Sequence, residues 1–131
     1  MLATALKRES DTAPTVLVVE EQFMIRMVLC DYLQECGFKV LMAKDAAGAI
    51  EIINRNDVDL RAVLSDKDVP GLANWLRANR PDLRLLLASG DDEKAKSAKE
   101  LCEGEKLAEN PYDVKTIVAR VRAIIDTIKL R

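Results

Sequence analysis

The segment LRAVLSDKDVPG, residues 60–71, is the stretch from which the rest of the fold can be worked out. Its stretch at 60–64, apolar except for Arg61, predicts a strand, and this stretch stops at two polar residues, Ser65 and Asp66. Pro70 and Gly71 then favour a turn. The segment therefore predicts a strand that delivers an aspartate to its carboxyl end, with a loop directly behind it.

Strand-like and helix-like patterns alternate on both sides of this segment. The predicted strands lie at 16–19, 38–42, 60–64 and 83–88, with a weak fifth strand at 105–108. Two of the predicted helices cover 22–35 and 72–79. A further helix lies between them and is capped by Asp45, and another runs from Asp91 or Asp92 to about Cys102. Pro111 introduces the last helix. Five such alternations predict a three-layer α/β fold built around a parallel sheet.

Length and charge fit one globular domain of 131 residues. We expect a flexible leader at 1–13 and a single domain at 14–131, with no output domain attached. The 20 basic and 22 acidic residues give a net charge of -2, which provides no reason to expect nucleic-acid binding. No apolar run approaches the ~20 residues that a membrane-spanning helix needs.

Histidine and cysteine content narrows the possible chemistry. The chain has no histidine, which excludes Ser-His triads and most transition-metal sites. Its three cysteines, Cys30, Cys36 and Cys102, have no metal-type spacing, and we predict them to be reduced thiols in a cytoplasmic protein. Any chemistry must then come from carboxylates, hydroxyls and amines.

Acidic side chains follow two of the predicted strands. Glu20 and Glu21 come directly after the first strand, Asp66 and Asp68 after the third, and Ser89 after the fourth. Ligands of open α/β sheets bind at the carboxyl ends of the strands, so we expect these residues to converge. Crowded carboxylates need a cation, and Mg²⁺ accepts one or two carboxylates together with phosphate oxygens. The pattern therefore suits phosphoryl transfer.

Four segments of the chain resemble motifs of response-regulator receiver domains, in the order that this family has them. They are VLVVEEQ at 16–22, VLSDKDVPG at 63–71, LLLASG at 85–90 and KLAENPYD at 106–113. The resemblance covers roughly residues 14–128. It implies a flavodoxin-like (βα)5 sandwich with a parallel sheet in the order 2-1-3-4-5, a shortened third helix and a role in two-component signalling.

The resemblance also assigns roles to the residues at the strand ends. Asp66 would accept a phosphoryl group from a histidine kinase or a phosphotransfer protein, and Ser89 would be the switch hydroxyl. Glu20, Glu21, Asp66 and Asp68 would hold Mg²⁺. The chain would act as a stand-alone signalling module through protein contacts, and we do not expect it to be an enzyme.

The chain departs from the family pattern at the pocket itself. Glu21 stands where a metal-binding Asp is expected, and its extra methylene displaces the carboxylate. Asn110 stands where the family has a lysine, and an amide brings no positive charge. The segment between Asp66 and Ser89 is shorter than in the family, and Leu107 replaces an aromatic switch residue. Phosphorylation-dependent signalling and a phosphorylation-independent pseudo-receiver are therefore nearly balanced hypotheses.

The sequence allows more than one interpretation of its lysines, of Ser89 and of its surface. Lys67 or Lys106 could supply the missing cation, although both suit a solvated surface, and Ser89 could serve only as a local helix cap. The face formed by the fourth helix, the fifth strand and the fifth helix would bind a protein partner or a second copy of the chain. Residues that could contribute to it are Lys94, Lys99, Lys115 and Arg122. The Asp66-x-Asp68 pattern is also similar to that of haloacid-dehalogenase-type phosphatases, in which Asp68 would be a general acid.

Overall fold

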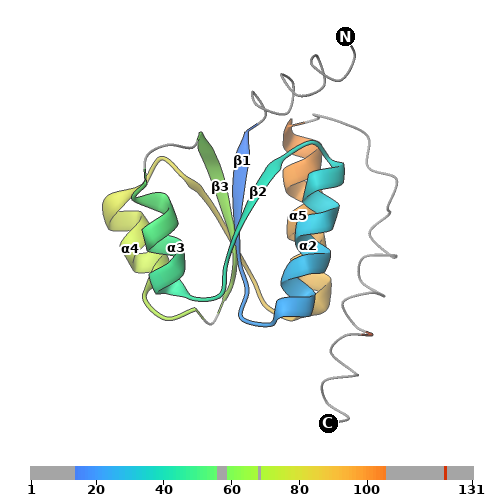
Figure 1. Ribbon diagram of the computed structural model, residues 1–131, viewed down its shortest axis with the longest axis horizontal. Helices are drawn as coiled ribbons and strands as arrows, with labels where there is room; N and C mark the ends of the chain where they lie inside the picture. Colours follow the sequence, from blue (N-terminus) through green and yellow to red (C-terminus); the bar gives the residue numbers. More distant parts are fainter. Residues whose placement is uncertain (1–13, 56–58, 68, 106–122, 124–131) are drawn as a thin grey trace.

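Four parallel strands form the central layer of the computed structural model, which describes residues 14–55, 59–67, 69–105 and 123 (Figure 1). The strands are β1 (Thr15–Val19), β2 (Lys39–Ala43), β3 (Leu60–Asp66) and β4 (Arg84–Ala88). Their order in the sheet is β2-β1-β3-β4, with every neighbouring pair parallel. The expected order is thereby confirmed for these strands. The predicted fifth strand at 105–108 is wrong at Glu105, which ends a helix, and its other residues lie outside the described part of the chain.

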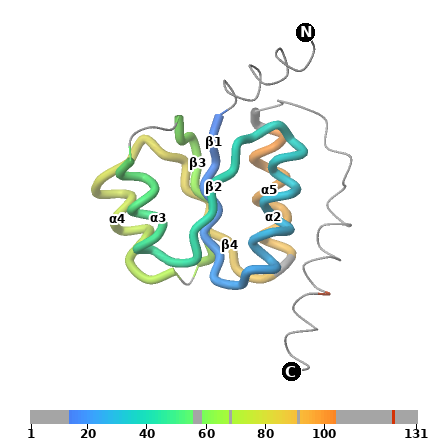
Figure 2. Tube along the Cα trace, in the orientation of Figure 1, coloured from blue at the N-terminus to red at the C-terminus, as the bar shows by residue number. Residues whose placement is uncertain are grey.

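Helices cover both faces of the sheet. They are α2 (Phe23–Glu35), α3 (Ala46–Ile53), α4 (Leu72–Asn79) and α5 (Gly90–Glu105). Helices α2 and α5 lie on one face and α3 and α4 on the other, as both backbone views show (Figures 1 and 2). The predicted three-layer fold and the short third helix at 72–79 are confirmed. None of the helices in the described part of the chain is long and apolar enough to span a membrane.

The central strand β1 is buried along its whole length because it serves both cores. Val16 and Val18 face the core under α2 and α5, whereas Leu17 and Val19 face the core under α3 and α4. This alternation is the period of two that a strand imposes on its side chains. A run of four apolar residues therefore anchors helices on both sides, as expected for a strand of a parallel sheet.

Turn and cap residues fix where several elements end. Gly37 adopts a positive φ of 100° directly after Cys36, the residue that caps the end of α2. The Asp45 carboxylate accepts a hydrogen bond of 2.8 Å from the backbone N–H of Gly48 and so caps α3. The Asp45 cap agrees with the sequence prediction. The predicted cap of α5 is wrong, because that helix begins at Gly90 and Asp91 and Asp92 lie inside its first turn.

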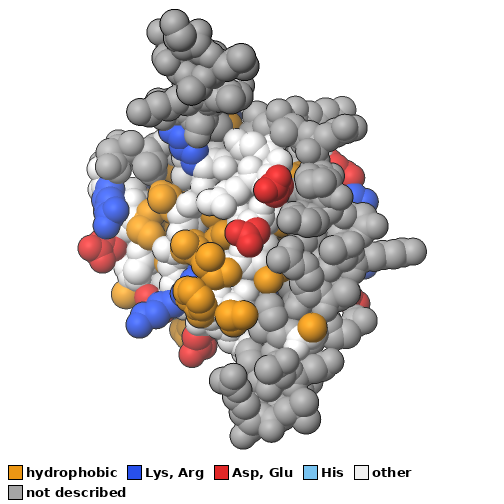
Figure 3. All heavy atoms as spheres, turned by 45° about the vertical axis from the view of Figure 1, so that its right-hand side comes forward, with side chains coloured by type: hydrophobic (Ala, Val, Ile, Leu, Met, Phe, Trp, Pro, Cys, Tyr) orange, Lys and Arg blue, Asp and Glu red, His pale blue; other side chains and the backbone are white. Residues whose placement is uncertain are grey.

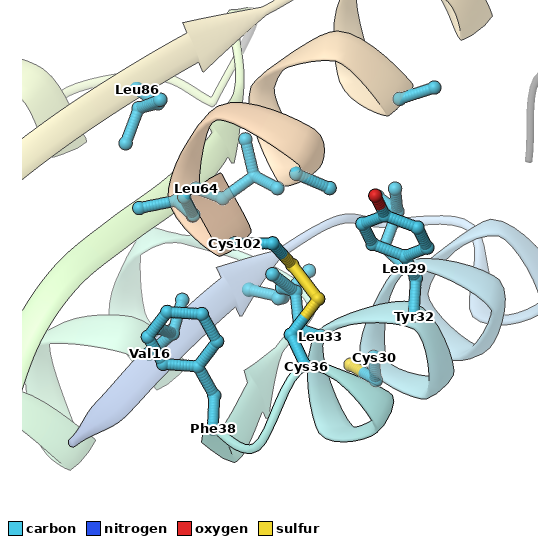
Figure 4. Close-up of a cluster of buried hydrophobic side chains, with 14 of the residues drawn as sticks. Val16, Leu29, Cys30, Tyr32, Leu33, Cys36, Phe38, Leu64, Leu86 and Cys102 are labelled. Carbon is cyan, nitrogen blue, oxygen red and sulfur yellow. A yellow bond between two sulfur atoms is a disulfide. The ribbon is translucent and has the colours of Figure 1, made fainter. Parts of the chain in front are cut away.

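A disulfide joins the two helices on one face of the sheet (Figure 4). Cys36 follows α2 and Cys102 lies on α5, with a Cα–Cα separation of 5.7 Å. The prediction of three reduced thiols is therefore wrong for these two residues. The reason is spatial, since 66 positions separate them and only the packing of α5 on α2 brings them together. Cys30 is a buried free thiol, and burial raises its pKa to about 12.

Candidate functional site

The carboxyl ends of β1 and β3 open onto one cavity of about 540 Å³. Val19 pairs with Ser65 in the sheet, so the residues that follow, Glu20 and Asp66, emerge side by side. The residues that line the cavity are Glu20, Glu21, Gln22, Lys44, Asp45, Asp66, Val69, Pro70 and Lys94. The sheet thus gathers Glu20, Glu21 and Asp66 at a common rim, although β1 and β3 lie far apart in the sequence.

A lysine from α5 bridges the two inner carboxylates of this rim. The ammonium nitrogen of Lys94 lies 2.7 Å from Oδ2 of Asp66, and it also forms an ion pair and hydrogen bond with Oε1 of Glu20. Lys94 is 7% exposed and Glu20 is 3% exposed, so the contact between them is shielded from solvent. The pocket therefore contains a buried positive charge supplied by the chain itself.

The electrostatic environment of Lys94 keeps it protonated. Burial lowers the pKa of Lys94, but the hydrogen bonds to Asp66 and Glu20 outweigh that effect and leave the pKa above its ordinary value. An unpaired ammonium group would be costly at such a position. The two carboxylates are consequently what allows a lysine to be buried there.

Glu20 is held in place by several contacts. Its Oε2 accepts a hydrogen bond of 3.1 Å from the backbone N–H of Gln22. Its carbonyl oxygen accepts one of 2.6 Å from the guanidinium of Arg26, and its own N–H donates to the carbonyl of Ala43 at 3.0 Å. Glu21 differs from Glu20, because it lines the same cavity but is exposed. The two glutamates of the pair therefore occupy different environments.

Asp66 ends β3 with its backbone fixed and its side chain partly open to solvent. Its carbonyl oxygen accepts a hydrogen bond of 2.9 Å from the Ser65 hydroxyl, and the next N–H, of Lys67, donates to Ala88 at 3.0 Å. The Asp66 side chain is 24% exposed. A small phosphodonor could reach this carboxylate from the cavity.

Ser89 makes its contacts within the first turn of α5. Its hydroxyl donates to Oε2 of Glu93 at 3.2 Å, and its N–H donates to the same oxygen at 2.7 Å. These two hydrogen bonds lower the pKa of Glu93. The geometry matches the interpretation in which Ser89 has a local capping role, and the expected role as a switch hydroxyl stays a prediction.

Only part of the predicted Mg²⁺ site lies within the described residues. No group of three or more Asp, Glu, Cys or His side chains among them is arranged to hold a metal ion. One oxygen each of Glu20 and Asp66 is bound by Lys94, which places a positive charge beside both predicted ligands. Asp68 and Asn110, the other predicted members of the site, lie outside the described residues.

Lys94 is the functional-site residue that sequence reasoning missed. Its predicted place on an exposed partner surface is wrong, because the side chain is buried. A usable signal existed, since Lys94 shares a spacing of four and seven residues with Ala98 and Leu101, which belong to the core under α2 and α5. Lys67, the other candidate cation on the described chain, is exposed, and Lys106 lies outside the described residues.

Comparisons with known proteins agree with this architecture. No model of a protein family matches the chain. The sensor kinase CckA of Brucella abortus is 29% identical over 119 residues, which cover 86% of this chain and 12% of the kinase. The probable transcriptional regulatory protein TcrX of Mycobacterium tuberculosis is 27% identical over 123 residues, which cover 90% of this chain and 53% of TcrX. The chain thus spans about half, or much less, of the curated relatives that it matches.

Solved structures with the same fold include receiver domains. The signal receiver domain of an HD domain-containing protein from Pseudomonas fluorescens Pf-5 gives a TM-score of 0.55 at 22% identity, covering 91% of this chain and 99% of that one. A sensor protein from Polaromonas sp. JS666 gives a TM-score of 0.54 at 24% identity, covering 87% and 97%. The chain therefore has a receiver-type fold. Its motifs and its strand order resemble those of response-regulator receiver domains. Its curated relatives include a probable transcriptional regulatory protein.

Proposed function

We propose that the chain is a receiver module of two-component signalling in which Asp66 is the phosphoacceptor. The observation that carries this proposal is the position of the Asp66 carboxylate, at the carboxyl end of β3 and facing a cavity shared with Glu20 and Lys94. A nucleophilic carboxylate needs access for the donor and a positive charge nearby to offset the phosphoryl oxygens. The cavity supplies the access, and Lys94 supplies the positive charge.

The proposed step is a transfer of one phosphoryl group onto Asp66. A carboxylate oxygen of Asp66 attacks the phosphorus of a phosphohistidine, carried by a histidine kinase or a phosphotransfer protein. The new O–P bond forms while the P–N bond breaks, and the histidine nitrogen keeps the electron pair of that bond and takes up a proton. The product is an acyl phosphate on β3, whose negative charge lies within reach of the Lys94 ammonium.

Protein contacts would carry the signal in and out of the module. Phe23 is 60% exposed and Met24 is 56% exposed, and both follow directly after Gln22, which lines the cavity. Arg26 lies over the Phe23 ring, with 5.4 Å between the guanidinium carbon and the ring centroid. Figure 3 shows apolar side chains grouped on one face of the molecule. Large exposed apolar side chains next to a reactive cavity suit a docking surface for a partner protein.

A second candidate function is a phosphorylation-independent pseudo-receiver. It is favoured by the Lys94 ammonium, which already neutralises part of the charge of Asp66 and binds one oxygen each of Glu20 and Asp66, two of the predicted Mg²⁺ ligands. In this case the acidic pocket would stabilise the fold, and signalling would depend only on the surface.

Labelling with acetyl phosphate separates these functions. We expect stoichiometric, hydroxylamine-sensitive labelling of the wild-type chain and none of Asp66→Asn. Absence of label on the wild-type chain would favour the pseudo-receiver. Repeated turnover of a generic phosphate ester, abolished by Asp68→Asn, would instead favour a phosphatase of the haloacid-dehalogenase type.

A further inference from the structure

We infer that Lys94 is the resident cation of the acidic pocket and takes the place of a divalent metal ion between Glu20 and Asp66. The inference rests on the proposed function only in treating Asp66 as the acceptor. It concerns the way in which this chain balances the charge of its pocket. That balance determines whether a phosphodonor would need Mg²⁺.

The charges of Glu20, Asp66 and Lys94 are arranged as they would be around a bound cation. Two carboxylates at neighbouring strand ends repel each other unless a cation lies between them. Here the cation is present, because a single ammonium group contacts Oδ2 of Asp66 and Oε1 of Glu20. The remaining oxygen of Glu20 accepts a backbone hydrogen bond from Gln22. Both inner carboxylates are thus paired with one ammonium, which offsets one of their two negative charges without a metal.

Helix α5, which bears Lys94, is held in a fixed position by its packing. Ala95 and Ala98 next to Lys94 are buried in the core shared with α2, which fixes the backbone from which the lysine extends toward the two carboxylates. The far end of α5 is tied to the end of α2 through Cys102 and Cys36. A divalent ion would have to displace a buried ammonium or bind beside it. Both are unfavourable, because displacement breaks the two ion pairs of the ammonium and binding places like charges in contact.

The chain also departs from the family pattern at the predicted metal site. Glu21 is exposed, and Asn110 brings no positive charge to the position where the family has lysine. In this chain Lys94, from α5, brings a positive charge to the pocket. The buried positive charge of the pocket therefore comes from α5, whereas Lys44 lines the cavity as an exposed side chain.

Mg²⁺ titration of three proteins tests the inference: the wild-type chain, Lys94→Met and Lys99→Met. Lys99 is the matched control because it lies on the same helix and is half exposed, with its ion pair to Glu103 at 3.5 Å. We expect calorimetry or NMR to show at least about tenfold tighter Mg²⁺ binding in Lys94→Met than in the two proteins that keep this lysine, since a unit charge in contact with the ion has been removed. Equal affinity in all three proteins would overturn the inference.

A second measurement uses the wild-type chain alone, in case Lys94→Met does not fold. Reductive methylation followed by mass spectrometry reports how accessible each lysine is. We expect Lys94 to remain protected while Lys99 reacts, both without Mg²⁺ and with it in large excess. Methylation of Lys94 that appears only when Mg²⁺ is added would show that the metal displaces the ammonium, and the inference would be wrong. Acetyl phosphate labelling in parallel tests the acceptor role of Asp66 separately.

Discussion

Lys94 and Asp66 lie 2.7 Å apart, ammonium nitrogen to carboxylate oxygen, although they belong to different layers of the fold. The aspartate comes from the end of a central strand and the lysine from a helix that packs on one face of the sheet. Because Lys94 also pairs with Glu20, one side chain links β1, β3 and α5. Removing one member of such a buried charge network is costly, because its partner is left buried and unpaired.

Removing the charge of Lys94 should destabilise the fold strongly. Lys94→Met leaves Glu20 buried and unpaired, and breaking a buried ion pair from one side typically costs about 3–5 kcal/mol. Urea denaturation should therefore show a large fall in the free energy of unfolding. The control Lys99→Met removes only an exposed pair and should change that free energy by less than about 1 kcal/mol. A similar fall in the free energy of unfolding in both variants would show that the ion pair between Lys94 and Glu20 contributes no more to stability than an exposed pair.

Coupling between Lys94 and Glu20 should appear in a double-mutant cycle. Replacing both charges, as in Lys94→Met with Glu20→Gln, removes the unpaired charge that makes each single variant costly. We expect the double variant to lose less stability than the sum of the two single variants, with a coupling of about 1–3 kcal/mol in urea denaturation. Strict additivity would indicate that the two side chains do not share an ion pair in solution.

Much of the fold, but less of the site, could be predicted from the sequence. Period-two and period-3.6 patterns are local, so the four described strands and the short helix at 72–79 were predictable from the order of residues. The contact of Lys94 with Glu20 joins residues 74 positions apart, and it depends on which face of α5 packs toward the sheet. The spacing of Lys94 from Ala98 and Leu101 places it on the buried side of α5, but nothing local identifies a partner 74 positions away. The disulfide was missed for the same reason.

Reduction of the disulfide should lower stability without removing the secondary structure. A bond that closes a loop of 66 residues restricts the unfolded chain, and the loop-entropy relation gives about 4 kcal/mol. We expect a dithiol reductant, or the pair Cys36→Ala and Cys102→Ala, to lower the thermal midpoint while far-UV circular dichroism keeps its shape. Thiol counting under denaturing conditions supplies the check, with one reactive thiol before reduction and three after it. Three thiols in the unreduced protein would mean that the bond does not form.

The pH dependence of stability should carry a contribution from Cys30. Its pKa is raised from the ordinary value of 9.0 to about 12 by burial, so the folded chain keeps the proton that the unfolded chain loses. The stabilisation is therefore fully present below pH 9 and is lost as the pH rises from 9 toward 12. Wild type should lose stability over this range faster than Cys30→Ala, as measured by urea denaturation at several pH values. Parallel curves for the two proteins would contradict the buried position of this thiol.

Asp66→Asn should abolish labelling by acetyl phosphate and should also change stability, and the two effects must be separated. The amide keeps a hydrogen-bonding oxygen for Lys94 but loses the charge. A hydrogen bond to a charged group contributes about 1.5–3 kcal/mol, and the 24% exposure of the side chain places the expected loss at the lower end. The variant should therefore remain folded at room temperature, so that absence of label reports on chemistry. Lys99→Met, which should label like wild type, completes the comparison. Persistent labelling of a folded Asp66→Asn protein would assign the acceptor to another carboxylate of the rim.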